Sequence, residues 1–207
     1  MAFNQTQFNN FVSNLTLYSG SSTVFNQYQN QIQIDNLKKY LINLEVLNPN
    51  TLLVGEAPGY NGCALTGIPF TSEFIISTHN NSGVLKGAKA LGCQKETTAT
   101  IVWGKLDNLN SLGKLILPPI LWNIFPFHSH KIANPLSNRS PITSELFYGI
   151  GVLNDLISLF PSVQSVYAIG QVAGNAINNL SNFVTVIRHP SNGGKPKFNK
   201  DIDAIYP

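Results

Sequence analysis

The amino-acid sequence predicts a single-domain, three-layer α/β/α fold around a central, mainly parallel four-stranded sheet. Short apolar segments with the length of strands alternate with longer segments of helical periodicity, which is typical of a parallel sheet covered on both faces. The chain has 207 residues, enough for one full hydrophobic core. No internal repeat or low-complexity linker divides it, so residues 1–207 are expected to form one domain.

The first part of this prediction comprises one helix and two strands. Apolar residues recur at helical spacing over residues 34–45, and the lysines of that segment lie on the opposite side of the helix. A short apolar strand is expected at residues 52–54. A second strand is expected at residues 120–125, ending at Pro126, since proline cannot donate a backbone hydrogen bond to the sheet.

The second part alternates helices and strands. Ser140-Pro141 is a favourable helix start, with a capping hydroxyl and a proline at the first helical position, and the helix is expected to continue to Pro161. A strand at residues 165–169, a helix at 171–180 and a last strand at 183–187 complete the sheet. This order of elements is what a parallel sheet with crossover helices requires.

Composition excludes several classes of protein. Charged residues are only 11% of the chain, but 43% are hydrophobic, so burial can drive folding and disorder is not expected. The net charge of +3 allows a nucleic-acid partner without requiring one. The polar start lacks the features of a secretory signal, and the most apolar stretch is too short to span a bilayer, so a cytoplasmic protein without a membrane partner is expected.

The two cysteines are also interpreted on the expectation of a cytoplasmic protein. Without secretion, Cys63 and Cys93 are expected to be free thiols, and two cysteines cannot hold a four-thiolate iron–sulfur cluster. His128 and His130 have nearly the spacing of metal ligands, but no cluster of cysteines or carboxylates accompanies them. The sequence therefore predicts neither a metal site nor a cofactor.

Residues that are unusual in strands stand where the predicted strands end. These strand ends are Gly55-Glu56, Asn123-Pro126, Gly170 and Arg188-His189. In open parallel sheets, ligands bind beyond the carboxyl ends of the strands. The sequence therefore predicts a functional site at this edge.

Four segments of the chain resemble the uracil-DNA glycosylase superfamily. They are residues 53–59 (LVGEAPG), 66–73 (TGIPFTSE), 121–128 (LWNIFPFH) and 188–194 (RHPSNGG), and their order and spacing match that family from about residue 24 to residue 198. The resemblance implies a monomeric, monofunctional DNA repair glycosylase that flips uracil, or a related deaminated base, out of single- or double-stranded DNA and hydrolyses its N-glycosidic bond.

The resemblance assigns the base-binding residues. Phe70 would stack on the flipped base, although without the resemblance it would be interpreted as a core residue. The amide of Asn123 offers one donor and one acceptor, which match O4 and N3–H of uracil; the alternative is an amide bonded to the neighbouring backbone. Gly55 and Ala57 would lie beside the base. Gly59 stands where the best-known branch has a Tyr that excludes thymine, a role that the adjacent Tyr60 could take over.

His189 is the candidate for stabilising the leaving base. Breaking the glycosidic bond places negative charge on the base, and a neutral imidazole can donate a hydrogen bond to its O2 atom. Ser191 and the backbone N–H groups near Gly193 and Gly194 could grip a DNA phosphate, because glycine allows close approach.

Three further residues follow that segment. Lys195 and Lys197 would add positive charge at the phosphate, or would merely form a solvated face. Phe198 could wedge into the base stack.

Two carboxylates compete for the task of activating water. In the best-known branch an Asp fills the position of Ala57, which cannot accept a proton. Glu73 resembles an Asp that another branch carries just after its stacking aromatic, and it is the preferred acid–base group. Glu56 resembles the Glu of the iron–sulfur branch, which shares the GEAPG form, but it could instead be bonded to loop N–H groups.

Two alternatives to an active glycosylase remain open. One is a catalytically weak or inactive member of the same fold that only binds nucleic acid, which the Ala57 position makes credible. The other is a nucleotide-binding α/β protein with residues 55–59 as a phosphate loop. That loop lacks both the Lys-Ser/Thr of a P-loop and the three-glycine dinucleotide pattern, so this alternative is remote.

Overall fold

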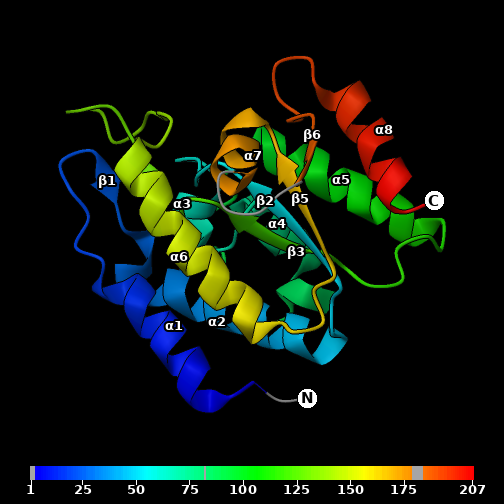
Figure 1. Cartoon of the computed structure of the whole chain (residues 1–207), viewed down its shortest axis with the longest axis horizontal. Coiled ribbons are helices and arrows are strands. Elements are labelled where there is room, and N and C mark those ends of the chain that lie inside the picture. Colours follow the sequence, from blue (N-terminus) through cyan, green and yellow to red (C-terminus); the bar gives the residue numbers. More distant parts are fainter. Residues whose placement is uncertain (1–2, 82, 179–183) are drawn as a thin grey trace.

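The computed structural model describes residues 3–81, 83–178 and 184–207, which form an α/β fold (Figure 1). Its central sheet is parallel and four-stranded, as the sequence predicts, and the strand order is β3-β2-β5-β6. The strands of this sheet are β2 (Thr51–Gly55), β3 (Ile120–Asn123), β5 (Ser165–Ile169) and β6 (Thr185–Ile187). A separate antiparallel pair joins β1 (Val24–Phe25) to β4 (His128–Ser129).

Helices cover both faces of the sheet, and Figure 1 shows α7 in front of it and α5 behind it. The α-helices are α1 (Gln5–Leu17), α2 (Gln31–Leu47), α3 (Cys63–Thr66), α4 (Glu73–His79), α5 (Thr97–Ser111), α6 (Thr143–Leu159), α7 (Gln171–Asn178) and α8 (Lys195–Ile205). Two short 3₁₀ helices are η1 (Gln27–Gln29) and η2 (Gly83–Leu85). Because the connections between parallel strands are right-handed, helices before and after β3 fall on opposite faces.

The strand β2 lies at the centre of the molecule. Leu52, Leu53 and Val54 are fully buried, because β3 and β5 flank them and helices cover both faces. A continuous apolar run is the pattern expected of such a strand. The register places Gly55 beside Asn123, so the ends of β2 and β3 coincide.

The outer edge of β3 is covered by α2. The Tyr40 hydroxyl accepts a hydrogen bond from the Leu121 N–H (2.8 Å) and faces the Leu121 carbonyl oxygen (3.3 Å). An open strand edge would otherwise leave these backbone groups without partners. The helical prediction for residues 34–45 is confirmed, since Ile34, Leu37, Leu41 and Leu44 all face the core.

Two predicted boundaries differ clearly from the structure. The Ser140-Pro141 start is wrong: α6 begins at Thr143, and the Glu145 side chain accepts a hydrogen bond from the Ile142 N–H (2.9 Å). The strand β3 ends at Asn123 rather than at residue 125, because the chain turns there to bond with the loop after β2. The predictions for residues 179–180 and 183 lie outside the described residues.

No described helix is long and apolar enough to cross a membrane.

Candidate active site

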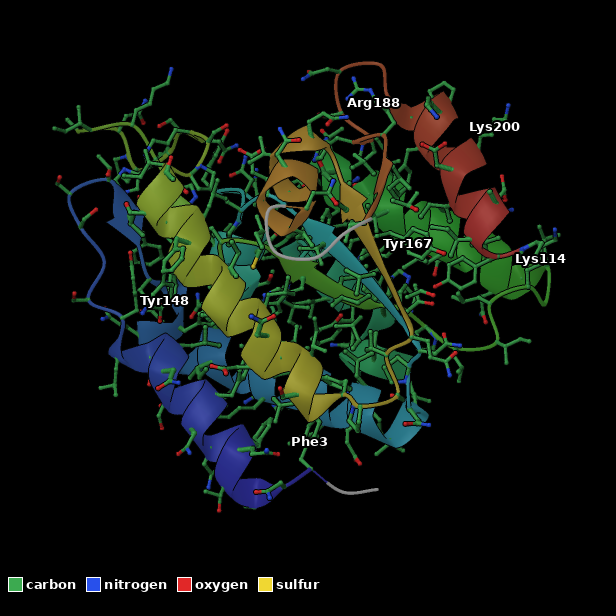
Figure 2. All side chains as sticks on the ribbon, in the orientation of Figure 1. Phe3, Lys114, Tyr148, Tyr167, Arg188 and Lys200 are labelled. Atoms are coloured by element: carbon green, nitrogen blue, oxygen red, sulfur yellow. The ribbon has the colours of Figure 1, made fainter. Side chains whose placement is uncertain are left out.

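The carboxyl edge of the sheet opens into a cavity of about 460 Å³. Arg188, which directly precedes one lining residue, lies near the top of Figure 2 and marks this edge. The sequence-predicted residues that line the cavity are Glu56, Ala57, Phe70, Asn123, His189 and Ser191. They come from segments far apart in the sequence and meet because parallel strands bring their carboxyl ends together.

Asn123 ends β3 and is only 4% exposed, yet its side-chain amide makes no hydrogen bond to any described residue. Asn123 lines the cavity, so its amide is not sealed in the protein interior. The alternative of an amide bonded to nearby backbone is therefore not what the structure contains. The Asn123 donor and acceptor are both available to a molecule in the cavity.

Gly55 makes room for the two base-binding candidates. A Cβ atom at Gly55 would lie 2.2 Å from Cζ of Phe70 and 3.1 Å from Oδ1 of Asn123. Any larger residue would therefore displace the Phe70 ring. Gly55 does not line the cavity itself but leaves space for the Phe70 ring in its wall, whereas Ala57 lines the cavity.

Phe70 is held in an unusual backbone conformation. Its φ angle is 55°, in the left-handed region that bulky residues rarely occupy. The Trp103 indole N–H donates to the Phe70 carbonyl oxygen (3.1 Å) and fixes this turn. Strained residues of this kind concentrate at functional sites, and here the strain directs an aromatic ring into the cavity wall.

His189 is held by Ser191, two residues further on. The Ser191 backbone N–H donates to Nδ1 of His189 (3.2 Å), and the Ser191 hydroxyl lies 2.8 Å from the same atom. Because a backbone N–H can only donate, Nδ1 must be the acceptor. The neutral ring therefore carries its proton on Nε2, which is left as a donor.

Burial lowers the pKa of His189 below its usual value of 6.5. The nearby carboxylates of Glu56 and Glu96 act in the opposite direction, and Arg188 lowers the pKa further. The net effect is a lowered pKa for His189. His189 is accordingly a neutral hydrogen-bond donor at pH 7.

The two predicted carboxylates lie in different surroundings. Glu56 lines the cavity, and its carboxylate makes no hydrogen bond to a described residue. The structure does not bring Glu73 to the cavity: it begins α4, is 8% exposed, and accepts a hydrogen bond from the Gln94 N–H (3.1 Å). This corrects the preference for Glu73, whose carboxylate anchors the segment that leads to α5.

Glu96 lines the cavity and was missed by the sequence analysis. It caps α5, accepting hydrogen bonds from the N–H groups of Thr98 (2.9 Å) and Ala99 (2.6 Å). The start of a periodic apolar segment just after Glu96 could have indicated the helix end. Its distance from Glu56 along the chain gave no sign that the two share a site.

The predicted phosphate-binding segment lies beside His189. Gly194 is required there, since a Cβ atom would lie 2.0 Å from the His189 carbonyl oxygen, and Gly193 has a φ of 74°. Neither lysine lines the cavity. Lys195 begins α8, and Lys197 pairs with Asp201 (2.8 Å), as a solvated helix face would.

The expectation that Phe198 wedges into DNA is wrong. Its side chain is 1% exposed and packs in the core beside Ile202, one turn further along α8. Apolar residues four positions apart share one face of a helix, and this face is buried.

Tyr60 does not line the cavity; its N–H donates to Oδ1 of Asn138 (3.1 Å). Gly59 does line it, and a Cβ atom there would meet no other atom within 4 Å. The wall beside Gly59 is therefore open, and the structure does not bring the Tyr60 ring forward as a replacement barrier.

A further part of the cavity wall was also missed by the sequence analysis. It is formed by Ser129, Asn138, Arg139 and Ser140. Arg139 is fixed by a two-fold hydrogen bond to Glu145 (2.7 and 2.8 Å), which raises its pKa. Ring nitrogens of His128 lie 2.8 Å from the Pro58 carbonyl oxygen and 3.0 Å from that of Pro135, so this histidine holds two loops of the wall together.

Cys63 and Cys93 are both free thiols, as predicted. Burial raises the pKa of Cys63 to about 12, so this cavity residue is a neutral thiol rather than a nucleophile. Residues 3–81, 83–178 and 184–207 contain no group of three or more metal-binding side chains.

No protein-family model and no curated protein sequence matches the chain. Among solved structures, it is similar to the crystal structure of wild-type SMUG2 from Pedobacter heparinus. The TM-score is 0.70, the sequences are 16% identical, and the match covers 100% of this chain and 97% of that one. The chain shares the SMUG2 fold. At this identity the likeness concerns the fold alone.

Proposed function

We propose that this protein is a monofunctional DNA glycosylase that hydrolyses the N-glycosidic bond of uracil, or of a related deaminated base, flipped out of DNA. The observation that carries the proposal is the unpartnered amide of Asn123, buried beside the Phe70 ring in a cavity that also contains His189. The fold shared with SMUG2 supports the same class of reaction.

Base recognition rests on Asn123 and Phe70. The Asn123 Nδ2–H group would donate to O4 of uracil, and Oδ1 would accept from N3–H. Cytosine presents the reverse pattern on this edge and would leave both amide atoms mismatched. Stacking on Phe70 would contribute about 1–3 kcal/mol to holding the extruded base.

Bond cleavage rests on His189. As the bond between C1′ and N1 breaks, its electron pair moves into the uracil ring and reaches O2. The Nε2–H donor of His189 would stabilise that charge, and a single donor of this kind commonly accelerates a reaction about 10²–10³-fold. No lysine occurs among the described residues that line the cavity, so no Schiff-base nucleophile is proposed.

Water addition is assigned to Glu56. The water oxygen would form the new bond to C1′ while its proton passes to the Glu56 carboxylate, which has no competing hydrogen bond among the described residues. Ser191 and the N–H groups near Gly193 and Gly194 would hold the DNA backbone. The chain is proposed to act as a monomer, without metal or cofactor.

The deciding experiment uses single- and double-stranded oligonucleotides with one uracil, treated with the protein and then with alkali. Cleavage at the uracil supports the proposal. Retention of DNA without cleavage would favour a binding protein that has lost turnover, which is the second candidate because Ala57 lines the cavity where the resembled branch has an Asp.

A further inference from the structure

A second cavity, of about 260 Å³, is separate from the candidate active site. It is lined by residues of α2, α4, α5 and η2 and by the loop that leads from α5 into β3, in which Figure 2 labels Lys114. No described residue lines both cavities. The proposed reaction therefore leaves the second cavity without a role.

Apolar side chains form most of the lining of the second cavity. They come from η2 (Val84 and Leu85), from α5 (Leu106) and from the loop before β3 (Leu115 and Pro118). A cavity with apolar walls and a few placed polar groups is the usual form of a small-molecule site. The lining therefore suits a small, largely apolar molecule.

One carboxylate gives this lining its charge. Oδ2 of Asp107 lies 3.0 Å from Nε2 of His79, and the Asp107 side chain is still 54% exposed. No lysine or arginine occurs among the described residues that line the second cavity. A carboxylate can accept more hydrogen bonds than one histidine provides. The charge complement of this lining is therefore a ligand with an ammonium group.

Aromatic rings form the wall beside Asp107. Trp103 and His79 both line the second cavity, with their ring centroids 5.3 Å apart and their planes inclined by 54°. Trp103 and Asp107 are four residues apart on α5, so they share one face of the helix, with Cβ atoms about 5–6 Å apart. A flat aromatic ring that stacks on Trp103 therefore reaches Asp107 with an ammonium group on a short arm.

Trp103 also connects the second cavity to the candidate active site. Its indole N–H lies 3.1 Å from the Phe70 carbonyl oxygen and 3.3 Å from Oγ1 of Thr71. This contact holds the left-handed turn at Phe70, whose ring lines the first cavity. A molecule that fixes the Trp103 ring would therefore stabilise the turn that presents Phe70 to a base.

We propose that the second cavity is an effector site for a small, flat aromatic amine, which stacks on Trp103, pairs its ammonium group with Asp107 and favours the base-stacking position of Phe70. Binding of the amine does not depend on the proposed function, whereas its effect on the base rests on it. Because Phe70 holds the base and takes no part in bond cleavage, the effector should tighten substrate binding without raising the maximal rate.

The first test measures binding of two probes to the full chain without DNA by isothermal titration calorimetry. Tryptamine should bind at least about tenfold more tightly than indole-3-acetate, which has the same ring but a negative charge. Asp107→Asn should abolish this difference. Equal binding of the two probes to wild type, or no binding of tryptamine, would overturn the proposal.

Asp155→Asn is the matched control. Asp155 is an exposed carboxylate on α6 that lines neither cavity, so its loss should leave the preference for tryptamine unchanged. Thermal unfolding of both variants checks that they fold. An equal loss of preference in Asp155→Asn would show that tryptamine responds only to net charge, which contradicts a site at Asp107.

The second test measures single-turnover excision of uracil over a range of enzyme concentrations, with and without saturating tryptamine. The enzyme concentration that gives half the maximal rate should fall about fivefold, and the maximal rate should change less than about twofold. Asp107→Asn should not respond. If tryptamine binds wild type but shifts neither quantity, the effector role is rejected.

Failure of the proposed function has a different signature. If tryptamine binds with the expected charge preference but no uracil is excised, the glycosylase reaction fails by itself. Fluorescence anisotropy with a uracil-containing oligonucleotide then replaces the rate measurement. A fivefold tightening of DNA binding by tryptamine would support the effector site, and unchanged DNA affinity would reject it.

Discussion

Two buried asparagines, one on α2 and one at the cavity, differ in their hydrogen bonds to the rest of the protein. On α2, the Asn36 amide donates to the carbonyl oxygens of Thr66 (2.9 Å) and Lys89 (2.8 Å) and accepts from the Lys89 N–H (2.8 Å). At the cavity, the Asn123 amide is equally buried and bonds to no described residue. Of these two asparagines, the one that stabilises the fold has partners within the protein, whereas the one at the cavity leaves its donor and acceptor available to a ligand.

The glutamate side chains also differ in whether they have partners within the protein. Glu73 is bonded to the Gln94 backbone and Glu96 to the start of α5, while the Glu56 carboxylate faces the cavity without a described partner. A polar group that lines a cavity and has no partner within the protein is available to bind a ligand. The predictions below test whether these unpartnered groups carry the activity.

The largest effect is expected for His189→Ala. Loss of its Nε2–H donor should lower the single-turnover excision rate about 10²–10³-fold, because the charge on the leaving base loses its hydrogen bond. Affinity for an uncleavable DNA analogue, measured by fluorescence anisotropy, should change little. An unchanged excision rate would assign His189 to structure alone.

The next effect separates two carboxylates. Glu56→Gln should reduce excision about tenfold to a hundredfold, since an amide cannot take the proton from water. Glu73→Gln should leave the rate near that of wild type, because the amide oxygen can still accept from Gln94. Single-turnover rates at saturating enzyme give the ranking, and the reverse order would return the catalytic role to Glu73.

Asn123 and Asn36 provide a matched pair of substitutions. Asn36→Ala should lower the free energy of unfolding by about 1–3 kcal/mol, because it leaves three backbone groups without partners. Asn123→Ala should cost little stability, since no described hydrogen bond is lost. Urea denaturation measures both.

Asn123→Asp should also weaken discrimination against cytosine, because it removes the Nδ2–H donor that O4 of uracil requires. Excision from substrates that differ only in uracil or cytosine measures this discrimination. Wild-type base preference in the variant would show that Asn123 does not read the base.

The sequence predicted the central sheet well because its signal is local. The apolar run at Leu52-Leu53-Val54 and the unusual residues at the strand ends can be identified without tertiary information. Phe198 was misassigned because its helix was not predicted, although the spacing to Ile202 indicates a buried face. Glu96 and Arg139 could not be placed at the site, because only long-range packing brings α5 and the loop that contains Arg139 to the ends of β2 and β3.

The smallest effect concerns pH. Burial lowers the pKa of His189 in the folded protein, so the neutral, active ring persists as pH falls to 6.5, and excision should change less than about twofold between pH 8 and 6.5. The rate should decline only below this range.

The stability of the folded protein should depend on pH for the same reason. Unfolded His189 binds its proton near pH 6.5, and folded His189 binds it only at lower pH. The contribution of His189 to stability is therefore complete above pH 6.5 and decreases as the pH falls below 6.5. Urea denaturation of wild type and of His189→Gln, at pH values above and below 6.5, separates the contribution of His189 to stability from the contributions of the other histidines. A stability difference that grows as pH falls, to the advantage of wild type, would mean that folding raises this pKa, and the neutral donor at the cavity would have to be abandoned.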